Sequence, residues 1–398
     1  ICQNQTNMKN YIPFILILLL SLKMTGQQDT ISPNLDLRVY TSFRVHLALF
    51  DQDSEIQDGA SMAGFMFNYH FGKNKQFKAF VHGEFGIRLI DNEFSFQADP
   101  NTNDDGFTVL QFNDEPSTFS TRLGYVGIDF AKYGTISFGK LNSVYSDIAG
   151  QADIFNVLSG QSTYVYSPDG SDGGETGTGR AESAIVYRNV IGRFGFGLQT
   201  QMRARGGGNY FDNYGANLQL HITDYLSLGA AYNKVLLSTQ FEKLPNLQGL
   251  EGDPEYYTFS VQYKKGPLYL AGVYANQENG DFVNTIDLDI LQPATVVYSG
   301  KGYEFSGSYQ LLDKRLNVLA GFNYKKPETD NPNLPKDFKK QFYIAGLQYQ
   351  FIKYASVYSE YRYEDSVSKI GRVPPNVFLV GLKLDLDKKW SKYFDMSL

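Results

Sequence analysis

From residue 36 to residue 387 the sequence is a succession of short segments in which apolar and polar residues alternate. In the segment 303–311 the odd positions are Tyr, Phe, Gly, Tyr and Leu, and the even positions are Glu, Ser, Ser and Gln. Side chains alternate between the two faces of a strand, so each segment predicts a β-strand with one apolar and one polar face. Such strands suit a soluble sandwich, or a membrane barrel whose apolar face meets lipid and whose polar face lines a lumen.

The N-terminal segment favours the membrane barrel, because it predicts export. Residues 8–26 read MKNYIPFILILLLSLKMTG, with Lys9 after Met8 and an apolar run from Ile12 to Leu22. This run is shorter than the ~20 apolar residues of a membrane-spanning helix and has the basic start of a secretory signal peptide. We therefore expect upstream residues at 1–7, a signal peptide at 8–26 and a single barrel domain over 27–398.

Composition excludes several other classes of protein. The chain is 15% aromatic with 38 Gly, which suits strands, membrane interfaces and turns. The one cysteine, Cys2, precedes the expected start, and the four histidines fall on four separate predicted strands, so we expect no metal, no cofactor and no catalytic site. The formal net charge of −6 argues against nucleic acid as a partner, because a phosphate backbone requires a basic surface.

The pattern contains sixteen such segments, an even number that is typical of bacterial single-chain barrels. The connections between them alternate between short turns, such as 72–76 and 266–267, and long loops, such as 91–117 and 145–181. Short turns at one end and long loops at the other are typical of outer-membrane barrels. The expected strands are 37–49, 61–72, 77–90, 118–130, 134–144, 182–190, 193–204, 213–223, 226–237, 255–266, 268–278, 296–311, 316–326, 340–351, 354–364 and 376–387.

The longest loop, at about 145–181, is a candidate pore filter. It is rich in acids, including Asp147 and Asp153, and a barrel of sixteen strands encloses a water-filled lumen that such a loop could narrow. Bases on the opposite wall would create a transverse field that steers ions. Alternation assigns these charged side chains to the lumen: His82, Glu84, Arg88, Arg122, Arg188 and Arg203. The simpler alternative is that they only solvate a polar wall, and for Arg88 and Arg203 the two interpretations are equally balanced.

The segment 121–140, TRLGYVGIDFAKYGTISFGK, resembles the general trimeric porins of Gram-negative outer membranes. Tyr145, Asp147, Gly150 and Asp153 follow at the spacing of that family, and 179–180 with 185–189 resembles its return strand. The resemblance implies a 16-stranded antiparallel transmembrane β-barrel with short periplasmic turns, long extracellular loops and an inward-folded third loop. It also implies a homotrimer, surrounded by outer-membrane lipid and lipopolysaccharide, that passively conducts ions and small hydrophilic solutes.

Carried over position by position, the resemblance makes Arg122 and Arg180 wall arginines of the constriction. Asp153, with Asp147 in the same loop, becomes an acid facing them. The sequence departs from the family at 156–160, where Asn-Val-Leu-Ser-Gly replaces a Pro-Glu-Phe-Gly-Gly turn, and near Met62, where a wall arginine is replaced. Ion preference is therefore not carried over, and either Phe394 or Leu398 takes the place of the family's terminal phenylalanine.

Other functions stay open at this point. A substrate-selective channel, for an anion such as phosphate or for oligosaccharides, could use Arg122, Arg180, Arg188 and Tyr358 as a binding track. An outer-membrane hydrolase would need an outward-facing nucleophile with a His or carboxylate cluster, against which the scattered histidines argue. An adhesin or structural barrel would have no open pore.

Overall fold

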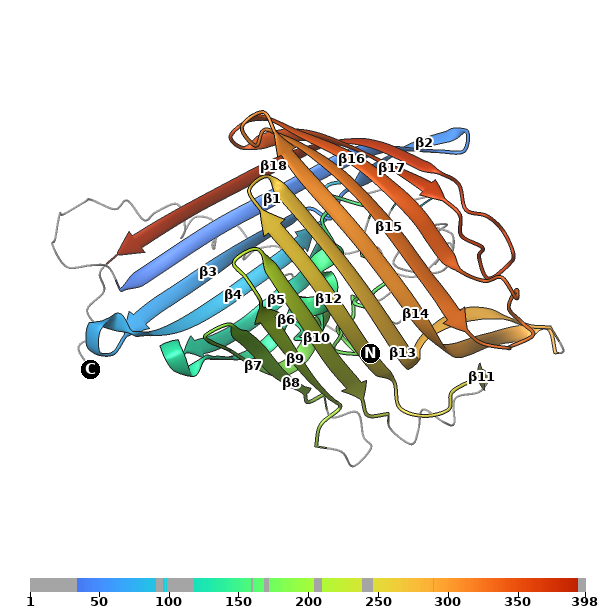
Figure 1. Cartoon of the computed structure of the whole chain (residues 1–398), viewed down its shortest axis with the longest axis horizontal. Coiled ribbons are helices and arrows are strands. Elements are labelled where there is room, and N and C mark those ends of the chain that lie inside the picture. Colours follow the sequence, from blue (N-terminus) through green and yellow to red (C-terminus); the bar gives the residue numbers. More distant parts are fainter. Residues whose placement is uncertain are drawn as a thin grey trace, which may run out of the picture.

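A computed structural model describes residues 34–90, 96, 98, 118–158, 160–167, 172–203, 210–237, 246–288 and 290–392. The expected signal peptide at 8–26 and the C-terminal candidates Phe394 and Leu398 lie outside these described residues. The described part forms an antiparallel β-barrel with sixteen wall strands, and Figure 1 shows the last strand lying beside the first. The expected fold class and number of strands are therefore confirmed.

The wall strands follow one another around the barrel in chain order. They are β1 (Leu35–Phe50), β3 (Met62–Phe71), β4 (Phe77–Ile87), β5 (Phe119–Asp129), β6 (Thr135–Asn142), β7 (Arg180–Ile191), β8 (Phe194–Gln201), β9 (Asn213–His221), β10 (Leu226–Val235), β12 (Glu255–Lys265), β13 (Leu268–Asp287), β14 (Gln292–Leu311), β15 (Leu316–Glu328), β16 (Lys340–Ile352), β17 (Ala355–Glu364) and β18 (Val377–Lys392). Two short strands, β2 (Asp53–Asp58) and β11 (Leu247–Gln248), pair with β1 and β14 at the long-loop end.

The barrel closes between β1 and β18, which pair from Leu35 opposite Lys392 to Phe50 opposite Val377. Closure pairs the first wall strand with the last, which is a condition for strands that cross a bilayer. Short turns join the strands at one end, and Gly192 and Gly266 adopt positive φ angles of 61° and 59° there, a conformation that glycine accepts without strain. Among the described residues, helical structure is limited to α2 (Ser146–Ala149) and the 3-10 turns η2 (Lys73–Lys75), η3 (Ala131–Tyr133) and η4 (Gly150–Ala152). No helix among the described residues is long and apolar enough to cross a membrane.

The polar side chains of the wall point inward and the apolar ones outward. Phe259 and Phe305 are 57% and 53% exposed, whereas their neighbours Thr258 and Glu304 are 0% and 2% exposed. This is the reverse of a soluble protein, in which apolar side chains are buried. The outer face is therefore suited to lipid and the inner face to water.

Aromatic side chains gather on the outer face near both ends of the strands. Toward the long loops, Tyr232 lies with its ring centroid 6.2 Å from that of Tyr214 and 5.0 Å from that of Tyr257. Toward the short turns, Phe77 lies 5.7 Å from Phe71 and 6.2 Å from Phe130. Such belts are typical of the two interfaces between membrane and water.

The expected loop at 279–295 was wrong, because β13 and β14 continue through it as a hairpin to Asp287 and from Gln292. The polar run 277–280 interrupts the alternation and looks like a loop start in the sequence. In the structure it is a β-bulge, at which the pairing with β14 shifts between Gln277 and Asp281 and then resumes. The last strand also continues past its expected end at 387, because its basic residues pair with the start of β1.

Candidate functional site

The connection between β6 and β7, residues 143–179, is called the inner loop below, and its described residues lie against the inner face of the barrel. At its start the backbone N–H of Val144 donates to Oε1 of Gln199 on β8 at 3.0 Å. Nδ2 of Asn217 on β9 donates to the Val144 carbonyl oxygen at 2.7 Å. Inward-facing carboxamides thus satisfy backbone groups that a loop inside a lumen would otherwise leave unpaired.

The far end of the inner loop is held by a single carboxylate on β17. Oε1 of Glu360 accepts a hydrogen bond from the backbone N–H of Asn156 at 2.6 Å, and Oε2 accepts those of Val157 and Leu158 at 3.1 and 3.0 Å. Hydrogen bonds to an ionised group are about twice as strong as neutral ones. Glu360 therefore fixes the loop tip more firmly than an uncharged side chain could.

Inward-facing glycines make room for the inner loop along its path. A β-carbon at Gly302 on β14 would overlap the carbonyl oxygen of Ser162, and one at Gly321 on β15 would lie 2.7 Å from the ring of Phe155. A β-carbon at Gly229 on β10 would lie 2.9 Å from the Ile148 side chain. The close approach of loop and wall therefore depends on the missing side chains.

Buried polar contacts tie the middle of the inner loop to itself and to β14. The Tyr145 hydroxyl donates to the carbonyl oxygen of Thr163 at 2.8 Å, and the N–H of Ser162 donates to Oε1 of Glu304 at 2.6 Å. Burial, with the nearby Glu304 carboxylate, raises the pKa of the Tyr145 phenol, so this hydroxyl keeps its proton and its donor role.

The inner face that the loop leaves largely uncovered runs from β18 through β1, β3 and β4 to β5, and carries several bases. Arg44 on β1 lies directly opposite Lys383 on β18, and Nη1 of Arg44 reaches the carbonyl oxygen of Asn156 at 3.2 Å. Arg38 on the same face of β1 pairs with Asp387 at 2.6 Å. Lys383 has the carboxylate of Asp385 at 3.4 Å. The free part of the lumen is therefore bounded by the inner loop on one side and, on the other, by a wall on which most bases are paired with acids.

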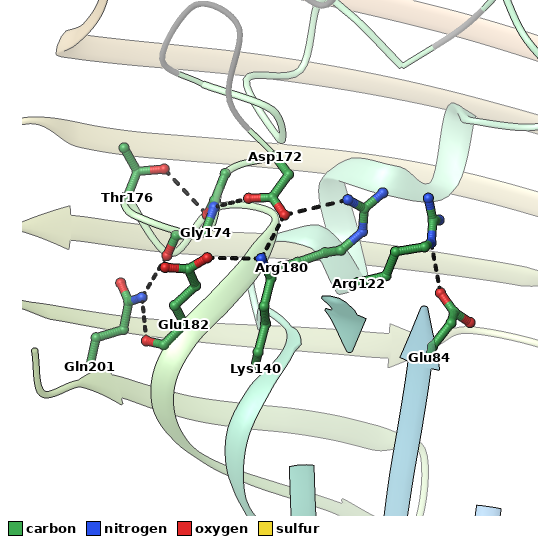
Figure 2. Close-up of polar contacts among 10 residues, drawn as sticks. Glu84, Arg122, Lys140, Asp172, Gly174, Thr176, Arg180, Glu182 and Gln201 are labelled. Atoms are coloured by element: carbon green, nitrogen blue, oxygen red, sulfur yellow. Dashed lines mark hydrogen bonds and ion pairs between the residues drawn. The ribbon is translucent and has the colours of Figure 1, made fainter. Parts of the chain in front are cut away.

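The structure places the two predicted wall arginines in separate ion pairs, both drawn in Figure 2. Nε of Arg122 donates to Oε1 of Glu84 at 2.9 Å. Nη1 of Arg180 lies 3.5 Å from Oδ2 of Asp172, which also contacts Lys140 at 3.0 Å. Both arginines thus have an acid already beside them, on β4 for Arg122 and in the inner loop for Arg180, which lowers the net charge that each adds to the lumen.

The two predicted loop acids differ in their surroundings. Asp147 is bound at the loop's start, where it accepts hydrogen bonds from Nε and Nη2 of Arg188 at 2.8 and 3.1 Å and from Asn217 at 3.1 Å. Asp153 is exposed, and its carboxylate lies beside Gly160. Asp147 and Arg188 therefore act together to hold the start of the loop, and Asp153 is the more exposed of the two predicted loop acids.

The other predicted lining residues are spread over the wall. His82 lies between the hydroxyls of Tyr40, at 2.7 Å, and Tyr125, at 2.8 Å, and thus belongs to the same inner face as Glu84. Arg203, past the end of β8, donates through Nη2 to the carbonyl oxygen of Glu175 in the inner loop. The pore-lining roles of His82 and Arg203 stay predictions.

Two further residues from the sequence interpretation are Arg88, whose pore-lining role stays a prediction, and Tyr358. The backbone N–H of Arg88 donates to Thr118 at the long-loop end, at 3.0 Å. Tyr358, the aromatic ring proposed for a binding track, is only 2% exposed in an apolar cluster with Leu158 and Phe342. Among the described residues no group of three or more His, Cys, Asp or Glu could hold a metal ion.

Sequence reasoning missed Arg44, Lys383 and Glu360. The alternation on the expected strands 37–49 and 376–387 was sufficient to place Arg44 and Lys383 on the lumen face, since they share it with Tyr40 and Asp385. No sequence signal identifies Glu360, because it meets residues 156–158 only after the barrel closes.

Replacing Glu360 by glutamine is expected to loosen the tip of the inner loop. A glutamine of the same size loses the charge that strengthens three hydrogen bonds, and hydrogen bonds to charged groups contribute about 1.5–3 kcal/mol each. We expect the open-channel current noise of single channels to rise about threefold or more. Glu328→Gln, which removes an exposed ion pair with Lys301, is the control and should leave the noise unchanged. Equal noise in wild type and Glu360→Gln would contradict this role.

Comparison with known proteins finds the same type of molecule. The family model described as "Gram-negative porin" matches residues 34–368. Outer membrane protein F of Serratia marcescens is 28% identical over 265 residues, which cover 61% of this chain and 67% of that protein. Outer membrane porin protein OmpD of Salmonella typhimurium is 25% identical over 280 residues, covering 66% of this chain and 73% of that protein.

Solved structures share the fold. A complex of Salmonella typhi OmpF with daunomycin superposes with a TM-score of 0.67 at 19% identity, covering 89% of this chain and 98% of that one. The trimer form of OmpT from Vibrio cholerae gives a TM-score of 0.61 at 16% identity, covering 88% of this chain and 99% of that one. An anion-selective porin from Comamonas acidovorans gives 0.61 at 15% identity, with 88% and 99% covered.

Proposed function

Because the chain belongs to the Gram-negative porin family and is an outer-membrane channel, we propose that its inner loop forms the narrowest part of the pore. Ions and small hydrophilic solutes would then diffuse passively between the inner loop and the wall from β18 to β5. Their selection follows from the width of this passage and the charges that line it.

The observation that carries the proposal is the attachment of the loop tip to Glu360. The loop starts beside β6 and β7, and this contact on β17 lies far around the barrel from them. A segment fastened at both places crosses the lumen, whereas a loop that rises from the rim would leave it open. The glycines at 229, 302 and 321 support the same path, because they let the loop approach the wall closely.

We assign the charges of the passage as follows. Arg122, Arg180 and Arg44 would supply the positive side, and Asp153 the acid on the loop. Asp147 and Arg188 neutralise each other at the root of the loop and would contribute less to ion preference. The field across the passage therefore depends on how far Glu84 and Asp172 offset the two predicted arginines.

We further propose that three copies of the chain associate in the outer membrane through their outer walls. The Vibrio cholerae OmpT to which the fold is similar has been solved in a trimer form. Outer-membrane lipid and lipopolysaccharide would surround the remaining outer face.

Planar-bilayer recording of the purified mature protein tests the proposal. Stable current that closes in three equal steps and rises linearly with salt would support a trimeric general porin, and the reversal potential under a salt gradient would give its ion preference. A folded barrel that passes no current would overturn the channel and favour an adhesin or structural barrel.

A substrate-selective channel is the second candidate, and saturable or solute-blocked current would distinguish it from a general pore. The track first considered for it, Arg122, Arg180, Arg188 and Tyr358, has weaker support, since Arg188 is paired with Asp147 and Tyr358 is buried. The feature that favours an anionic substrate is Arg44, which lies opposite Lys383 and whose Nη1 donates to a backbone carbonyl oxygen of the loop.

A further inference from the structure

Below the tip of the inner loop, toward the short turns, the inner face of the barrel carries a row of carboxamides. In the strand register Gln310 on β14 lies opposite Asn317 on β15, and Asn317 lies opposite Gln348 on β16. Neighbouring strands are about 4.8 Å apart, so the three side chains stand at successive positions across the strands. Gln348 is also the link to the inner loop, because Nδ2 of Asn156 approaches its Oε1 at 3.4 Å.

These carboxamides line a cavity of about 190 Å³ together with Gln350, Ser356 and Tyr354. Its volume equals the share of about six water molecules in the liquid, which suits a single sugar ring or a small polyol. The cavity lies on the passage between the inner loop and the short-turn mouth, which is the periplasmic mouth in barrels of this type. A solute that leaves the narrowest part of the pore toward that mouth would pass it.

Part of the polar surface of this cavity is not used within the protein. Oδ1 of Asn317 is buried and has no hydrogen-bond partner among the described residues. Gln348 uses one donor, through Nε2 to Oγ of Ser356 at 3.1 Å. Buried carboxamide atoms are normally paired, so Asn317 is a member of the row with hydrogen-bonding capacity that the protein does not use.

Charge plays a smaller part in this cavity than the carboxamides do. The guanidinium of Arg315 donates to the carbonyl oxygens of Gln350 and Phe351, both at 3.1 Å. The ammonium of Lys353 lies 5.0 Å from the centre of the Tyr354 ring. Lys314 adds a further positive charge to the lining, and the carboxylate of Asp385 adds a negative one. A strong anion site would leave its bases free, and here two of the three are engaged.

We propose that this cavity, the carboxamide subsite, binds a neutral polyhydroxylated solute of about the size of one sugar ring. A carboxamide offers both a donor and an acceptor, and so does each hydroxyl of such a solute, so a row of carboxamides matches a row of hydroxyls. The ring of Tyr354 offers an apolar surface for the carbon skeleton. This inference rests on the proposed channel function, because it places the subsite on the path of the diffusing solute.

The test uses glucose as the neutral probe, gluconate as its anionic counterpart and a polyethylene glycol of similar mass, which has few donors. Binding to the folded protein in detergent is measured by saturation-transfer NMR, which needs no current, and block of single-channel current is measured in planar bilayers. The variants are Gln310→Met at the exposed edge of the row and the pair Asn317→Leu with Gln348→Met. Gln219→Met, on the lumen face of β9 outside the cavity, is the matched control.

We expect saturable glucose binding and block in the wild type, and no saturation with the polymer. Gln310→Met should weaken glucose binding about three- to fivefold, and Asn317→Leu with Gln348→Met should weaken it about tenfold or more. The glucose affinity of Gln219→Met should stay within about twofold of that of the wild type. Linear, unsaturated glucose effects in a conducting wild type, or equal binding by the paired variant, would overturn the subsite. If gluconate binds more tightly than glucose, and the paired variant binds it as well as the wild type does, the cavity is an anion site on the lysines and not a carboxamide subsite. A wild-type protein that binds glucose by NMR but passes no current would contradict the proposed channel function and leave the subsite in place.

Discussion

Replacing both Arg122 and Arg180 by alanine is expected to shift the channel toward cations. The double replacement removes two positive charges from the proposed passage and leaves the carboxylates of Glu84 and Asp172 with fewer partners. Two unit charges within one Debye length of the ion path change the ratio of cation to anion permeability by about five- to tenfold at 0.1 M salt. The reversal potential of single channels under a salt gradient measures this shift.

The matched control keeps the charges and changes only the geometry. Arg122→Lys with Arg180→Lys should hold the reversal potential close to that of the wild type. Raising the salt to 1 M should reduce the effect of the alanine pair, because the Debye length falls to about 3 Å. An alanine pair that folds and conducts with an unchanged reversal potential would remove both arginines from the passage.

Replacing Gly302 by valine is expected to push the inner loop away from the wall. Any β-carbon at this position overlaps the carbonyl oxygen of Ser162, so either the loop moves or the barrel is strained. Because the N–H of the same Ser162 is bound to Glu304, the displacement also breaks a buried hydrogen bond to a charged group. We expect a loss of about 2–4 kcal/mol in the free energy of unfolding and a changed single-channel conductance.

Gly195→Val is the matched control for this prediction. Gly195 lies on the lumen face of β8, and a β-carbon at this position would have its nearest neighbouring atoms 3.8 Å away or more, which is ordinary contact. The control should retain the stability and conductance of the wild type, apart from a small effect of strand propensity. If Gly302→Val and Gly195→Val behave alike, the inner loop does not lie against β14 as described.

The strands could be predicted because each one carries its own two-residue period. The segments 257–264 and 303–311 needed no knowledge of their neighbours to be assigned, and the structure places their Phe259 and Phe305 outward as the alternation requires. The prediction of a loop at 279–295 was wrong for a local reason. A β-bulge at 277–281 interrupts the alternation of its own strand, and its pairing with the neighbouring strand cannot be read from that sequence alone.

The contacts of the candidate site could be predicted only in part. Alternation and resemblance both assigned Arg122 to the wall, and resemblance alone assigned Arg180. Their partners Glu84 and Asp172 depend on how neighbouring strands and the loop meet. Glu360 is about two hundred positions from the backbone groups that it holds, at a sequence separation of 202 to 204. A contact of that kind follows from barrel closure and not from any pattern along the chain.

The central claim is that the inner loop crosses the lumen and sets the width of the pore. Single-channel conductance in the presence of neutral polymers of graded size tests it most directly, because polymers too large for the narrowest point cannot lower the conductivity there. We predict a sharp size limit well below that of an unobstructed sixteen-stranded lumen, and a larger limit in Glu360→Gln, where the tip is released. A size limit equal to that of an open barrel, unchanged in Glu360→Gln, would contradict the account.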